Sequence, residues 1–391
     1  MDPAVAILLR LLAAIGVSVG LSLIVGRVLL RLDRRGAGVV GGVCAGVALG
    51  PAVLGGLAPG VYADWMVGGV VQSSAAARIE ARLPGEIESL LASGVSEVAA
   101  AEHEAQERGE AELLRREAER DRTLRRGAAG AIAASCALLA AVLLVRPGRV
   151  RRGALVSGVV AALLAGLTAA VAARVALGVD IASGAVFGAV LAGGVIGWRG
   201  MSASRWYGLG AMAVCAAGLA VFAGVWTGVA LAAFAGLGLL IRVLDPVAPG
   251  GRGARWTVEA VLVPMCSALV VSLAAADVDT GGAVLIGAAC LLAGDARLVA
   301  LWIGANLFES GNARARPLST WLVRSSRGGP GWQVLLLGLA VAGGGIDPGS
   351  AHGAAMVYAV AGAALTSEVM RPGAYRAMRR YRRDLSSLNG D

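Results

Sequence analysis

Long apolar blocks alternate with short polar segments along the 391 residues of the chain. About twenty consecutive apolar residues form a helix that is long enough to cross the hydrocarbon core of a bilayer. Eleven blocks approach that length, at residues 3–30, 36–59, 128–145, 153–177, 179–198, 206–224, 225–244, 256–276, 281–308, 332–346 and 353–370. The pattern therefore predicts an all-α, multi-pass membrane protein with about eleven transmembrane helices.

Composition agrees with this pattern. Hydrophobic residues make up 57% of the chain and charged residues only 16%, and the mean hydropathy is +0.73, well above the values of soluble proteins. The net charge is +9, and every basic residue is an arginine. Most arginines lie in short loops between apolar blocks, where they orient helices. We therefore expect the lipid bilayer, and not nucleic acid, as a partner.

The distribution of arginine also predicts an orientation. Loops rich in arginine follow the first, third, fifth, seventh, ninth and eleventh blocks, and such loops stay on the cytoplasmic side. We therefore expect a multi-pass protein of the plasma (cytoplasmic or inner) membrane, with its N-terminus outside and its C-terminus inside. Residues 115–126 hold six arginines in a segment placed outside, but long loops are translocated regardless of their charge.

The same pattern divides the chain into four parts. Two transmembrane helices come first, a polar helical insert that we expect outside the cytoplasm follows, then the transmembrane core and finally a basic cytoplasmic tail, at residues 1–60, 61–127, 128–370 and 371–391.

The polar insert is predicted to be helical. Pro84-Gly85 predicts a break between a short helix and a longer one. Glu104 and Arg108 have the i,i+4 spacing of helical ion pairs, and a sustained heptad pattern is missing, so a coiled coil is not predicted. The charges favour a solvated helical hairpin. The alternative is a surface for partner docking or dimerisation.

The second apolar block contains an interruption at Leu49-Gly50-Pro51. Proline has no amide hydrogen and restricts the residue before it, so a helix must bend or unwind there. Irregular backbone at membrane depth must be shielded by protein or by a water-filled cavity. The other interpretation of this block is a glycine-rich helix that packs closely on its neighbours.

This block also keeps the spacing of a known motif. It resembles the second helix of the monovalent cation:proton antiporter superfamily (cation/proton exchangers), and the residues in step are Ala45-Gly46, Leu49-Gly50-Pro51, Leu54-Gly55 and Pro59. Gly42 stands where the family often has Glu. Some similarity covers most of the chain except about 61–126, as in a divergent and truncated member. The resemblance implies an inverted-repeat core with broken helices and, by family analogy, a homodimer.

Two segments depart from the family pattern where the resemblance places the ion site. The fifth block should unwind at a turn rich in Thr and Ser, but here it is rich in Gly and Ala, with Gly193 and Gly194 as the candidate break. The sixth block should supply carboxylates, and residues 206–224 contain no acid. Exchange requires a carboxylate that holds either a proton or a cation. The ion site is therefore expected to be degenerate.

Asp295 and Arg297 are the charges inside the ninth block, where the family has a conserved Lys or Arg. A charge at the bilayer centre costs roughly 2.5–3.5 kcal/mol, so such residues are functional candidates. The resemblance implies a structural or site cation for Arg297, and Asp295 is a candidate displaced carboxylate for a proton or a monovalent cation. The alternative is that both pair with other helices as a buried tether.

The sequence offers little material for other chemistry. The five cysteines are scattered through apolar blocks without metal-like spacing, and there are only two histidines. No nucleophile, base and acid form a recognisable set. We therefore expect no metal site, no cofactor and no enzymatic activity.

Three functional hypotheses follow. The leading one is an antiporter-like integral membrane protein with a degenerate ion site and a binding, sensing or scaffold role. The second is an active monovalent cation/proton exchanger that uses Asp295 or another carboxylate. The third is a membrane platform that recruits a protein partner through the insert at 61–127.

Overall fold

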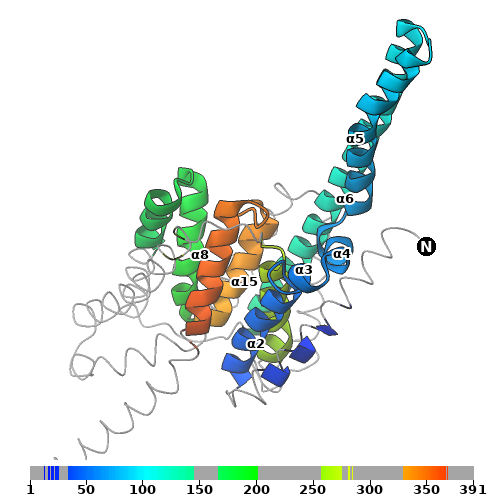
Figure 1. Cartoon of the computed structure of the whole chain (residues 1–391). Helices are drawn as coiled ribbons and strands as arrows, with labels where there is room; N and C mark the ends of the chain where they lie inside the picture. Colours follow the sequence, from blue (N-terminus) through cyan, green and yellow to red (C-terminus); the bar gives the residue numbers. More distant parts are fainter. Residues whose placement is uncertain are drawn as a thin grey trace, which may run out of the picture.

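The computed structural model describes residues 34–144, 166–200, 257–274 and 329–366, together with residues 13, 16, 17, 19–21, 23–25, 281, 284 and 368. Every regular element within these residues is helical, so the described part of the chain is all-α, as the sequence predicts. Figure 1 shows a bundle of helices from which a long helical hairpin projects.

Helix α2 (Arg34–Leu49) ends at the Leu-Gly-Pro sequence. Residues 50–53 form turns, and three short elements follow: α3 (Leu54–Leu57), α4 (Pro59–Tyr62) and the π-helix η2 (Ala63–Val67). Because Pro51 has no amide hydrogen, it cannot continue the α-helical hydrogen bonds. Among the described residues, Ala37–Leu57 is the stretch that is long and apolar enough to cross a membrane.

Glycines let α2 pack closely on a second segment, formed by the π-helix η3 (Val258–Leu262) and α12 (Val263–Ser272). Gly38, Gly42 and Gly46 follow each other at intervals of four residues. A Cβ atom at Gly42 would lie 2.6 Å from the Cα of Pro264, and one at Gly46 would lie 2.6 Å from the Cβ of Val271. Small residues at this spacing allow helix backbones to approach each other. The block is thus both interrupted and closely packed.

Helix α6 (Glu97–Leu144) has 48 residues and passes from the polar insert into the apolar bundle without a break. At 1.5 Å per residue it is roughly 70 Å long. Its N-terminal half packs against α5 (Val70–Ala92), and its C-terminal half packs against α12 and α15 (Gly329–Ala342). We call the hairpin of residues 70–126 the arm (Figure 1).

The arm departs from the sequence prediction at Pro84. Helix α5 continues through this proline, so the predicted break at Pro84-Gly85 is wrong. Proline removes one helical hydrogen bond, and the carbonyl left over belongs to the exposed Glu80, where water can bind it. The neighbouring Leu83 is buried, and α5 packs along α6. The chain turns instead at residues 93–96, where Gly94 has a φ of +85°.

Helix α8 (Ile181–Gly200) gives a second correction, because it is regular across Gly193 and Gly194. Glycine lowers helix propensity by about 1 kcal/mol, but it keeps both backbone hydrogen-bonding groups, unlike Pro51. In apolar surroundings these groups are best satisfied within a helix. Helix α15 is also unbroken from Gly329 to Ala342. The described parts of these two helices therefore do not form the pair of broken helices that the resemblance implies.

The core of the bundle consists mostly of alanine and valine side chains. It gathers residues from α2, α6, α8, α12, α15 and the helices Gly166–Leu177 and Ala351–Thr366. Alanines such as Ala133 and Ala354 are fully buried, and Phe187 and Leu335 are among the large side chains that are fully buried between the helices. Close packing of small residues is typical of helices that associate in lipid.

Two contacts connect separate parts of the chain at the end of the bundle from which the arm projects. The hydroxyl of Tyr62 donates a hydrogen bond to the carbonyl of Ser272 at the end of α12, over 3.4 Å. At the base of the arm, a guanidinium nitrogen of Arg126 lies 3.8 Å from a carboxylate oxygen of Asp347, in the loop between α15 and the next helix. The arm, the end of α12 and this loop therefore share one end of the bundle.

Candidate functional site at the base of the arm

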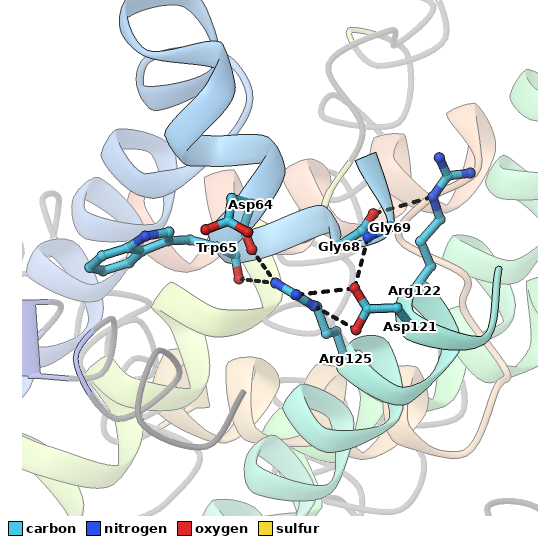
Figure 2. Close-up of polar contacts among 7 residues, drawn as sticks. All are labelled: Asp64, Trp65, Gly68, Gly69, Asp121, Arg122 and Arg125. Atoms are coloured by element: carbon cyan, nitrogen blue, oxygen red, sulfur yellow. Dashed lines mark hydrogen bonds and ion pairs between the residues drawn. The ribbon is translucent and has the colours of Figure 1, made fainter. Parts of the chain in front are cut away.

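A corner of two glycines joins η2 to the arm. Gly68 and Gly69 have φ angles of +76° and +64°, in the left-handed region that glycine adopts without steric cost. The amide of Gly69 donates a hydrogen bond of 2.8 Å to Oδ2 of Asp121, in α6. A Cβ atom at Gly68 would lie 2.5 Å from Nε of Arg125. The corner is therefore shaped for direct contact with α6 (Figure 2).

Arg125 ties this corner to α6. Its side chain is buried, and its Nη2 and Nε lie 3.0 and 3.2 Å from the two carboxylate oxygens of Asp121. Its Nη1 donates to the carbonyls of Asp64 and of Trp65, the second over 3.4 Å. Figure 2 shows the guanidinium group between the carboxylate and η2. One arginine thus satisfies an acid and two backbone carbonyls.

Arg122, one turn earlier in α6, adds two further contacts. Its Nε donates to the carbonyl of Gly68 over 3.4 Å, and its Nη2 lies 3.2 Å from the hydroxyl of Ser73 in α5. We call Gly68, Gly69, Asp121, Arg122 and Arg125 the arm-base clamp. The clamp joins η2, α5 and α6 through charge-assisted hydrogen bonds, which are stronger than neutral ones. It sets the direction in which the arm leaves the bundle.

Tyr62 is the last residue of α4. Partial burial, with a smaller contribution from Tyr358, raises the pKa of its phenol to about 12, although Arg126 opposes the shift. The phenol therefore stays protonated in the physiological range and serves as a hydrogen-bond donor to Ser272. This contact connects the short helices above α2 to the end of α12.

The predicted ion-site residues do not belong to this cluster. Asp295 and Arg297 lie outside the described residues, as do residues 206–224 of the sixth block. Leu49 is the last residue of α2 and Gly50-Pro51 lies in the interruption that follows, whereas Gly193-Gly194 lies in the regular helix α8. The described structure therefore brings none of these candidates together.

Two acids that the sequence places near block ends have different surroundings in the structure. Glu368 is only 1% exposed, although its position near the end of the last block suggests an interfacial side chain. Glu259 is half-buried in η3, and its carbonyl lies where a side chain at Gly38 would be. The backbone of η3 therefore approaches α2 closely at Glu259, and the side chain of Glu368 lies inside the bundle.

We also searched the described residues for groups of side chains that could bind a metal ion. No three His, Cys, Asp or Glu side chains in those residues are grouped closely enough to hold a metal ion. Cys136 and Cys266 are buried in the core, where they act as small apolar side chains.

Comparison of the chain with protein-family models, with curated proteins and with solved structures finds no match.

Sequence reasoning missed the arm-base clamp. Asp121 and Arg125 have the same i,i+4 spacing as the exposed pairs nearer the tip of α6, so spacing alone does not single them out. A weak signal is that Ala111, Ala118 and Arg125 are buried at intervals of seven residues. This is the spacing of helices that pack lengthwise. Because two of the three are alanines and the third is charged, the stripe is not visible as an apolar pattern.

Proposed function

We propose that this chain is a membrane-embedded helical scaffold. It holds a rigid arm on one side of the membrane for a protein partner, and it does not exchange cations for protons. The observation that carries this proposal is the continuity of α6, which runs through 48 residues from the tip of the arm into the packed core. A partner that binds the arm therefore acts directly on a core helix.

The surface of the arm suits a role outside the bilayer. Ion pairs nearer its tip than the clamp are exposed to solvent, as in Arg82–Glu86 at 2.7 Å and Arg115–Glu80 at 2.5 Å. Leu113 is 63% exposed on α6, and a shallow groove of about 500 Å³ runs beside it, lined by Ala105, Gln106, Gly109, Glu110, Glu112, Leu113 and Arg116. Small and charged residues along one helix leave room for a partner helix.

The membrane location rests on two observations. Ala37–Leu57 is long and apolar enough to cross a bilayer, and shorter apolar helices pack beside it. The segments that the arginine distribution assigns to the outside, which are the arm, the end of α12 and the loop at Asp347, share one end of the bundle. We infer a multi-pass protein with about eleven helices, the arm outside the cytoplasm and the tail inside.

The absence of exchange is inferred from the chemistry that exchange needs. The sixth block contains no acid, and α8 does not unwind at Gly193 and Gly194 to expose backbone carbonyls. Without a carboxylate that alternates between a proton and a cation, the two fluxes cannot be coupled. Asp295 is the candidate carboxylate that the sequence places well inside an apolar block.

The deciding experiment measures proton and cation flux in proteoliposomes that hold the whole chain, beside an Asp295→Asn variant and protein-free vesicles. We expect neither protein to couple Na⁺ or K⁺ gradients to proton movement. Flux that is lost in Asp295→Asn would establish an exchanger that works through Asp295. Strong pH-dependent flux that survives the substitution would establish an exchanger with a different site.

A further inference from the structure

The short segment between α2 and the arm exposes large apolar side chains. Each of its three helical pieces contributes one: Leu57 in α3 is 83% exposed, Val61 in α4 is 46% exposed, and Trp65 in η2 is 37% exposed. In a protein surrounded by water such side chains would increase the apolar surface in contact with solvent. They lie close together in sequence, and a partner of apolar character would cover them.

The position of this segment indicates which partner that is. The apolar stretch Ala37–Leu57 leads into it, and the charged arm begins directly after it at Val70. If the bundle is embedded in a bilayer, the boundary between lipid and water falls between these two parts. Tryptophan is enriched at this boundary because its ring is apolar and its N–H is polar.

The clamp fixes the backbone of η2, and with it the direction of the Trp65 side chain. The side chain of Arg125 is buried, and it donates hydrogen bonds to the backbone carbonyls of Asp64 and Trp65 in η2. Figure 2 shows the ring of Trp65 extending away from the guanidinium group. The polar backbone of η2 thus faces α6, and its tryptophan faces outward.

We propose that residues 53–67 form an interfacial collar whose exposed apolar side chains lie among the headgroups and upper acyl chains of phospholipids. The collar rests on the membrane location proposed above, and it goes beyond the scaffold role by assigning a lipid-binding surface. It also moves the boundary of the polar insert, because residues 61–67 belong to the bilayer interface and the solvated arm begins at Val70. The half-exposed Arg126, which follows Arg125 in α6, lies at the level where lipid phosphates accept hydrogen bonds.

The test uses a photoreactive benzoylphenylalanine in place of Leu57 or Trp65 in the full chain. The purified protein is reconstituted into vesicles of phosphatidylcholine and phosphatidylglycerol and irradiated, and adducts are identified by mass spectrometry. The matched control carries the same group in place of Leu113, which is 63% exposed on the arm. We expect phospholipid adducts at positions 57 and 65 and none at position 113.

Other outcomes overturn the collar in distinct ways. Cross-links to a second copy of the chain at positions 57 and 65, without lipid adducts, would make this surface a protein interface. Equal lipid adducts at position 113 would mean that the arm itself lies on the membrane. Flotation of the vesicles separates the two proposals: protein that floats without lipid adducts overturns the collar alone, whereas protein that does not float overturns the membrane location as well.

Discussion

Arg125 and Arg108 each pair with an acid four residues earlier in α6, yet their surroundings differ. The Arg125 side chain is 9% exposed and its partner Asp121 is 22% exposed. The Arg108 side chain is 69% exposed and pairs with Glu104 in solvent. Exposed pairs contribute little because water solvates both charges. A buried charge that loses its partner remains without compensation.

The first prediction compares these two arginines. Arg125→Met is expected to destabilise the protein by about 3 kcal/mol, because it removes the cation that pairs with Asp121 and the guanidinium that donates to two backbone carbonyls, and leaves the Asp121 charge with the Gly69 amide alone. Arg108→Met, the matched control, is expected to change stability by less than about 0.5 kcal/mol. Thermal unfolding of the detergent-solubilised protein measures both. Equal effects of the two substitutions would show that the clamp is not a structural requirement.

Two local interactions operate at the scale of elements. Helix Gly166–Leu177 ends at Gly178, whose φ is +65°, and Asp180 caps α8. One carboxylate oxygen of Asp180 accepts hydrogen bonds from the amides of Ala182 and Ser183, over 3.0 and 3.2 Å. Such caps satisfy amides that have no partner within the helix. Hydrogen bonds from Ser183 lower the pKa of this carboxyl from its usual value.

The second prediction follows from the sign of that shift. Because the pKa of Asp180 is lower in the folded state, its contribution is present above the unfolded pKa of about 3.9 and is lost as the pH falls through the folded value. Asp180→Asn, which keeps an N-cap acceptor, should therefore remove this part of the acid sensitivity, whereas Asp180→Ala should lower the melting temperature at neutral pH. Melting curves between neutral pH and acid measure both effects. An unchanged melting temperature in Asp180→Ala at neutral pH would contradict the capping role.

Helix α6 is the element that joins the arm to the core. Gly127 lies in this helix at the base of the arm, and a Cβ atom there would meet nothing within 4 Å. The site therefore accepts a side chain without a clash. Substitutions at Gly127 can change helix continuity without disturbing the packing of the core.

The third prediction uses this position. Gly127→Pro removes a helical hydrogen bond and should cost about 3 kcal/mol or more in helix stability, whereas Gly127→Ala should strengthen the helix. Spin labels in place of Leu113 and His352 report the distance between the arm and the bundle by pulsed electron paramagnetic resonance. We expect the distance distribution to broaden with proline and to stay narrow with alanine. A narrow distribution in both variants would mean that the clamp alone holds the arm.

At the scale of the whole molecule, the proposed orientation rests on the distribution of arginine along the sequence. The arginine-rich segments alternate along the sequence, and the Tyr62–Ser272 and Arg126–Asp347 contacts place arginine-poor segments at the end that carries the arm. A short loop rich in arginine resists translocation, whereas a long segment such as the arm does not. The arm is therefore expected on the outside.

The fourth prediction tests that orientation. A cysteine in place of Glu107, in a background without the native cysteines, should react with a membrane-impermeant thiol reagent in intact cells. A cysteine in the tail, in place of Ser386, is the matched control and should react only after lysis. Labelling at position 107 that requires lysis would reverse the topology.

Local chemistry accounts for what the sequence determined by itself. The long apolar blocks indicate helices, and every regular element among the described residues is helical. The interruption after Leu49 coincides with Gly50-Pro51, where a residue of low helix propensity adjoins one that has no amide hydrogen. The candidate ion residues Asp295 and Arg297 were selected from sequence and stay predictions, because they lie outside the described residues.

Tertiary structure decided the features that depend on distant partners. Packing against α6 keeps α5 helical through Pro84, and α8 stays regular across Gly193 and Gly194, although local propensity disfavours a helix at both places. The clamp joins Gly69 to Asp121, 52 residues apart. Local patterns cannot predict such a contact, because its energy comes from burial and from hydrogen bonds that exist only once α5 and the segment before it have packed against α6.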